Sequence, residues 1–133
     1  MSFKVKNSQL SSEVLQVLNQ LIEQDIDASC AFRLTRIIKH LSSIVEDKVK
    51  MEKKIFDKWV ERDDFGNPIV AKDESGNPIE DTVMLTDLGG FTKEMSELMS
   101  IENDIPYSKI NFDDLKLQTA KVKDLIKIDF LFE

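Results

Sequence analysis

An unbroken helical pattern constrains this chain more than any other feature of its sequence. Apolar residues recur at spacings of three and four from Leu34 to Val60, and no Gly or Pro interrupts them. The pattern predicts a helix over Ala28–Val60, with Asp27 as its N-cap. At 1.5 Å per residue such a helix is roughly 50 Å long. Because this is more than a compact domain of 133 residues requires, we expect part of it to leave the core.

The apolar stripe of this helix thins between Val45 and Ile55, where charged residues fall on or near it. Here the helix is expected to face solvent or a partner. Four residues on this part of the helix or just beyond it are therefore candidate interface residues: Lys48, Glu52, Phe56 and Trp59. Trp59 lies beyond the thin region and is the best single candidate for an interface anchor.

Shorter elements are expected on both sides of the long helix. An amphipathic helix over Ser8–Gln24, capped by Asn7 or Ser8, should form an antiparallel hairpin with it. Gly89-Gly90 predicts a turn, followed by a helix over Phe91–Ser100. Extended segments are predicted at Ile101–Ile105 and Tyr107–Phe112. A final helix is predicted over 119–132, capped by Thr119 and burying Val122, Leu125, Ile126 and Phe130.

One acidic phrase occurs twice, as DDFGNPI at residues 63–69 and as DESGNPI at residues 73–79. Asp-x-x-Gly is typical of a type I turn whose glycine has positive φ, and the proline then favours an extended chain. We predict β-arms over Pro68–Lys72 and Pro78–Leu85, hinged at Asp73–Gly76, with the first copy ending the long helix. The arms add three candidate interface residues: Ile69, Val70 and Ile79.

Two other interpretations of the repeat are a calcium loop and a recognition tag. A calcium loop needs oxygen ligands at alternating positions and a distant bidentate Glu. The acids here are adjacent pairs, Asp63-Asp64 and Asp73-Glu74, which do not converge in that way. Structural turns are therefore the favoured interpretation.

Catalytic chemistry has little support in the sequence. Cys30 and His40 are the only residues of their types, so no zinc set and no Cys/His dyad can form within the chain. Cys30 is expected in the core near the helix start and His40 at its boundary, and Phe32, like most of the aromatic residues, is expected on an apolar stripe. We expect no catalytic residues, no metal and no cofactor, although a convergent acid cluster would be compatible with an enzyme.

The charge is unevenly distributed. The net charge of −7 argues against direct nucleic-acid binding, and no segment is apolar enough to span a membrane. Residues 33–58 carry a net charge of +4, whereas 61–81 and 87–114 each carry −5. This separation could support head-to-tail association of subunits, or the segments could neutralise each other within one fold.

We therefore predict a helix-rich α+β fold in a single domain, residues 1–133. It combines a long antiparallel helical hairpin at about 8–60 with a small β-hairpin or meander at about 61–86. Shorter helices and strands complete the chain at about 87–133.

The layout resembles a family of small uncharacterised proteins of tailed bacteriophages and prophages. Three patterns support the resemblance: A.RL..I.K.L at residues 31–41, D..GN.I at 63–69, and F.KE...L at 91–98. The sequence departs from the family in its doubled GNPI phrase and in a C-terminus richer in lysine. The resemblance implies phage origin and synthesis in the cytoplasm of an infected bacterium, and it brings no catalytic residues and no cofactor.

These expectations favour a non-enzymatic phage protein that contacts copies of itself or other phage proteins, as a multi-copy structural or assembly component of the virion. The alternative is a small acidic protein that binds and inhibits a host factor, such as a polymerase or a defence nuclease. Incorporation into the virion distinguishes the first function from the second.

Overall fold

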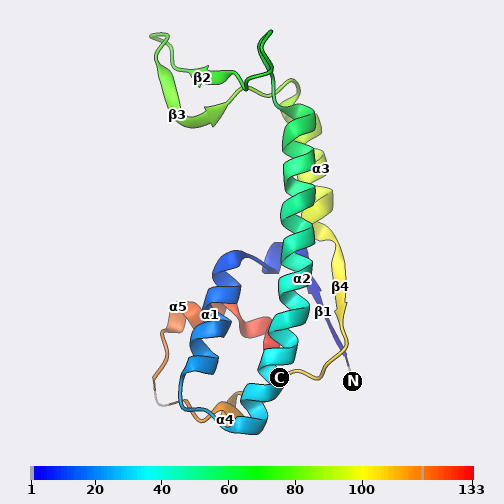
Figure 1. Cartoon of the computed structure of the whole chain (residues 1–133), viewed down its shortest axis with the longest axis vertical. Helices are drawn as coiled ribbons and strands as arrows, with labels where there is room; N and C mark the ends of the chain where they lie inside the picture. Colours follow the sequence, from blue (N-terminus) through cyan, green and yellow to red (C-terminus); the bar gives the residue numbers. More distant parts are fainter. Residues whose placement is uncertain (1, 118) are drawn as a thin grey trace. The chain divides into compact units, whose positions relative to one another are not determined.

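The computed structural model has a helix-rich α+β fold, which confirms the predicted fold class (Figure 1). It describes residues 2–117 and 119–133. The contacts group into two compact units, Met1–Lys48 with Met99–Glu133, and Val49–Leu98. The boundary between them falls inside the long helix α2 (Ala28–Trp59), so part of this helix belongs to each unit.

The first unit contains most of the short elements of the chain. They are β1 (Phe3–Lys6), the 3-10 turn η1 (Asn7–Gln9), α1 (Ser12–Glu23), β4 (Glu102–Ile105), α4 (Phe112–Leu115), α5 (Val122–Lys127) and the 3-10 turn η2 (Asp129–Leu131). Strands β1 and β4 pair antiparallel, with Phe3 opposite Ile105. The two helices α1 and α2 form the predicted hairpin, in which only the first part of α2 accompanies α1 (Figure 1).

The core of this unit joins one face of α1 to one face of α2. The fully buried side chains are Val5, Leu10, Leu18, Leu34, Ile37, Leu41, Ile105, Ile110, Leu115, Ile128 and Leu131. Cys30 is also buried, as predicted. The backbone N–H of Cys30 donates a hydrogen bond to the side chain of Asp27 at 3.3 Å, which confirms Asp27 as the N-cap of α2.

The start of the first helix was predicted four residues too early. Ser11, not Asn7 or Ser8, is the N-cap of α1, and its hydroxyl accepts a hydrogen bond from the N–H of Val14 at 3.3 Å. Leu10 is extended, so the turn before it is a separate 3-10 element. The helical spacing of apolar residues includes Leu10, so the sequence pattern does not reveal that the predicted helix is interrupted at Leu10.

The second unit contains the last part of α2, strands β2 (Val70–Lys72) and β3 (Pro78–Val83), and most of helix α3 (Leu88–Ser100). The strands pair antiparallel, as the β-arm prediction requires. Ile55 of α2 and Leu98 of α3 are both buried, and the Lys58 ammonium forms an ion pair with Glu94. The end of α2 is thus partly covered by its own chain.

Gly89 and Gly90 lie inside the first turn of α3, so their predicted role as a turn between elements was wrong. The C-terminal helix prediction was also too long. The helix α5 begins only at Val122, and Val122 and Ile126 are 72% and 65% exposed instead of buried. Tyr107–Phe112 contains a single bridge, Ile110 to Phe132, instead of a strand.

Candidate functional site

The two copies of the repeated phrase fold into the same hairpin turn. The side chains of Asp63 and Asp73 each accept two hydrogen bonds from backbone N–H groups two and four residues further on, at 2.9–3.0 Å. Gly66 and Gly76 have φ of +82°, and each donates its N–H to the carbonyl of the aspartate three residues earlier, Asp63 or Asp73, at 3.0 Å. The turn prediction is confirmed, and in each copy one carboxylate oxygen is used by its own loop.

The first copy was predicted to end the long helix, and this prediction was wrong. Helix α2 already ends at Trp59, and Arg62 bridges to Pro68, so residues 60–69 form a hairpin of their own. Val60 bridges to Leu85, and the N–H of Met84 donates to the carbonyl of Ile69 at 2.7 Å, which joins the two hairpins. We call residues 60–86 the twin-hairpin segment; its two loops extend separately in Figure 1.

A groove of about 680 Å³ opens between the second hairpin and the end of α2. Three of the predicted interface residues, Phe56, Val70 and Ile79, meet in its lining. Val70 and Ile79 remain 43% and 41% exposed. The sequence predicts an interface role for each of these residues separately, and the structure places them on one surface.

An irregularity in β3 shapes this groove. Asp81 has φ of +59°, in the left-handed region, and the hydroxyl of Thr82 donates to the carbonyl of Ile79 at 2.7 Å. The strand register therefore shifts between the pairs Val70–Val83 and Lys72–Pro78. Such bulges bend a strand and change the direction of its side chains. Here the bulged residues form one side of the groove.

The other predicted interface residues lie elsewhere. The ring of Trp59 packs against Gly90 of α3, and the Lys58 ammonium lies 5.1 Å from the centroid of this ring. The contacts of the Trp59 ring are therefore with residues of the second unit. The ammonium of Lys48 donates to the carbonyl of Leu10 in the first unit. Glu52 and Ile69 are half-buried.

A second surface feature is not apparent from the sequence. Phe32, expected on an apolar stripe, is 63% exposed and lines a hollow of about 640 Å³ on the first part of α2. Arg36, Lys39, His40 and Tyr107 also line it. A spacing of four between Phe32 and Arg36 placed them on one helix face, but nothing in the sequence indicated that Tyr107 would join them. We call this site the basic aromatic hollow.

His40 lies at the boundary of the core, as predicted. Its Nε2 is 3.3 Å from the carbonyl oxygen of Asp104, and its ring meets Tyr107 edge-on with centroids 6.2 Å apart. These contacts fix the ring in place and leave it part of the wall of the hollow.

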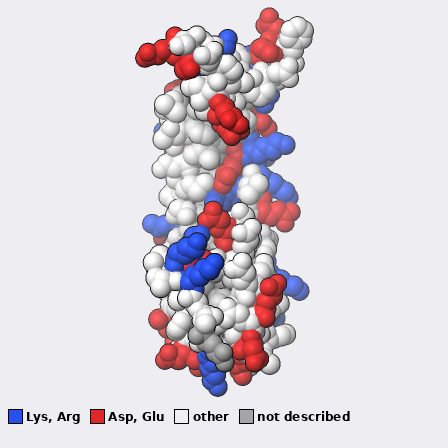
Figure 2. All heavy atoms as spheres, turned by 90° about the vertical axis from the view of Figure 1, so that its left-hand side faces the viewer, with Lys and Arg blue, Asp and Glu red and all other residues white. Residues whose placement is uncertain are grey.

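Acidic side chains are spread over the whole face seen in Figure 2, including its top. Among residues 2–117 and 119–133, no group of three or more His, Cys, Asp or Glu side chains could hold a metal ion. No helix in the part of the chain that the structure describes is long and apolar enough to cross a membrane. No protein-family model, curated protein or solved structure matches this chain.

Proposed function

We propose that this chain is a non-enzymatic bacteriophage protein that acts through protein–protein contacts, as a multi-copy structural or assembly component of the virion. The observation that carries the proposal is the apolar groove lined by Phe56, Val70 and Ile79, which is open to solvent. Covering apolar surface is favourable by about 25 cal/mol per Å². A partner chain seated in the groove would gain this free energy.

The turns next to the groove reduce the conformational entropy that the hairpin would lose when a partner binds. Each loop is held by its own aspartate and by a glycine in the left-handed region, so the second hairpin has a defined shape before a partner arrives. A preorganised surface loses less conformational freedom on association than a flexible one.

The bacteriophage part of the proposal comes from the resemblance carried by residues 31–41, 63–69 and 91–98. Quantitative mass spectrometry of purified phage particles tests it. We expect several copies of the wild-type chain per particle. Ile79→Asp places a charge in the groove and should remove the protein from particles, whereas Ile126→Asp, on an exposed site of α5 outside the groove, should not.

The protein's absence from particles, together with a strictly monomeric state after purification, would contradict this function. Equal incorporation of the Ile79→Asp and Ile126→Asp variants would show that the groove is not the contact surface.

A second candidate function follows from the acidity of the twin-hairpin segment. Six exposed acids, Asp63, Asp64, Asp73, Glu74, Glu80 and Asp81, lie on it. Such a surface could occupy the nucleic-acid-binding groove of a host polymerase or defence nuclease. In that case the chain would be absent from particles, and a purified host enzyme would bind it more weakly as salt is added.

A further inference from the structure

We propose that the first hairpin loop of one copy, with Phe65 at its end, docks in the basic aromatic hollow of a second copy. The inference rests on the proposed function, because it requires copies of the chain to associate. It adds a specific pair of surfaces that the groove does not include.

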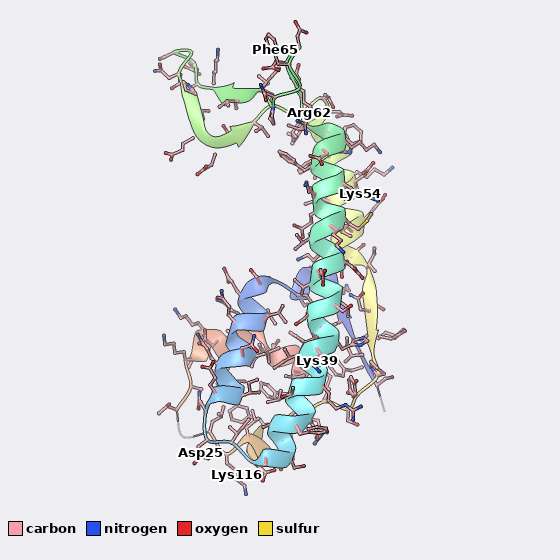
Figure 3. All side chains as sticks on the ribbon, viewed as in Figure 1. Asp25, Lys39, Lys54, Arg62, Phe65 and Lys116 are labelled. Atoms are coloured by element: carbon pink, nitrogen blue, oxygen red, sulfur yellow. The ribbon has the colours of Figure 1, made fainter. Side chains whose placement is uncertain are left out.

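The hollow has an aromatic wall with cations beside it. The guanidinium carbon of Arg36 lies 5.6 Å from the centroid of Phe32 and 6.0 Å from that of Tyr107. Tyr107 is in turn held edge-on by His40. The exposed ammonium of Lys39 adds a second cation at this site (Figure 3).

The rim of the hollow is also basic. Arg33 lies one turn before Ile37 on the same helix, and its Nη2 donates to the carbonyl of Lys109 at 3.4 Å. Together with Arg36, it lines a smaller cavity of about 160 Å³ beside Phe32 and Tyr107. This surface fits a ligand that has both a negative charge and an aromatic ring.

The first hairpin loop has both of these properties. Phe65 is 89% exposed at the end of the loop (Figure 3), and the acidic side chain of Asp64 is next to it. Asp63 accepts a hydrogen bond from the N–H of Phe65, and Arg62 donates to the carbonyl of Gly66 at 2.8 Å. The loop is therefore fixed, and it presents an aromatic ring to solvent.

The second hairpin loop serves as an internal comparison. It has the same turn hydrogen bonds and an adjacent acid, Glu74, but Ser75 stands where the first loop has Phe65. The turn itself therefore does not require an aromatic residue at this position, which leaves the exposed ring of Phe65 without a role inside its own hairpin.

A nucleic-acid strand is the competing occupant of a basic aromatic surface. The net charge of −7 opposes it, whereas the separation of charge within the chain favours a second copy. A contact between two different surfaces is heterologous, so it builds rings or open chains of subunits.

Two complementary variants test the contact by light scattering after gel filtration. Phe65→Ser gives the first loop the residue of the second loop, and Arg36→Glu reverses a charge in the hollow. Each should weaken self-association by about tenfold or more. A mixture of both variants retains one intact loop and one intact hollow per pair, so it should contain 1:1 dimers of twice the 15.3 kDa chain mass, held by this contact, which neither variant forms alone.

Matched controls separate this contact from general effects. Lys54→Glu makes the same charge change on α2 outside the hollow (Figure 3), and Val122→Ser removes an exposed apolar side chain that does not line it. Both should assemble like the wild type. Recovery of dimers in the mixture also shows that both variants are folded.

Wild-type assembly by Phe65→Ser or Arg36→Glu would overturn the inference and leave the proposed function standing. A wild-type chain that is monomeric at every concentration and absent from particles would overturn both. Loss of oligonucleotide binding in Arg36→Glu, with the assembly state unchanged, would assign the hollow to nucleic acid instead.

Discussion

The indole ring of Trp59 occupies the space that any side chain at position 90 would need. A Cβ atom added to Gly90 would lie 2.8 Å from Cζ2 and Cζ3 of that ring, closer than such atoms approach in folded proteins. Gly90 therefore allows α3 to pack against the end of α2. This contact lies within the second unit, next to the twin-hairpin segment.

The first prediction concerns the two adjacent glycines of α3. Gly90→Ala should destabilise the protein by about 1–2 kcal/mol, because the cost of overpacking exceeds the gain of about 1 kcal/mol in helix propensity. Gly89→Ala, whose Cβ would lie 3.4 Å from Asp87 Oδ1, should be neutral or stabilising. Urea unfolding of both variants measures the difference, and equal stability would contradict the packing of Trp59 on Gly90.

The second prediction concerns the turn between β2 and β3. Gly76→Ala forces an alanine to φ of +82°, and Asp73→Ala removes the acceptor of two backbone N–H groups. Each should destabilise this hairpin by about 1 kcal/mol, which lowers amide protection about fivefold. Hydrogen exchange of the β3 amides measures the loss. Ser75→Ala, in the same turn, should leave protection unchanged.

The third prediction concerns the ion pair between Glu94 and Lys58. The hydrogen bond from the Lys58 ammonium holds the pKa of the Glu94 carboxyl below its ordinary value of 4.5. A lowered folded-state pKa gives stability that is present above 4.5 and is lost as the pH falls through the folded-state pKa. Glu94→Gln should therefore be less stable than the wild type at pH 7 and equal to it once Glu94 is protonated.

Thermal unfolding of both proteins between neutral and acidic pH measures this convergence. A constant difference across the whole range would show that the carboxylate charge is not involved.

The fourth prediction concerns the thiol of Cys30. Burial in the core of the first unit raises the pKa of this thiol, so both access and thiolate formation are suppressed. Reaction with a thiol reagent at neutral pH should be much slower in the native protein than in urea. Native and denatured rates that agree within a few-fold would mean that this end of α2 opens readily.

Much of the fold could be predicted from local signals. Both ends of α2 were predicted within one residue, because the sequence contains an unbroken apolar period and Asp27 as a cap at its start. The second hairpin was predicted because Gly76 permits a positive φ and Pro78 fixes its own φ regardless of what surrounds them.

The C-terminal helix was predicted too long because packing, and not a local signal, decides where it ends. The chain leaves the α-helical conformation at Ile128, and the 3-10 turn after it buries Leu131, so Val122 and Ile126 face solvent. A periodic pattern cannot show this change of helix type. The side chain of Asn111 accepts a hydrogen bond from the N–H of Asp113, and this cap could have revealed the missed helix α4.

The candidate site was only partly visible in the sequence. Phe56, Val70 and Ile79 could be selected from their places on the end of the long helix and on the predicted β-arms, but in the structure they meet in a groove that the bulge at Asp81 also lines. Phe65 was not selected, because the turn explained the residues around it and left the ring itself without a predicted contact.

Sedimentation equilibrium of the purified wild-type chain over a wide concentration range tests the central claim most directly. A protein that works through contacts between its copies should show a mass that rises with concentration above that of the 15.3 kDa monomer, and Ile79→Asp or Phe65→Ser should reduce that rise. A wild-type mass that stays at the monomer value at every concentration would contradict the claim that copies of the chain contact one another.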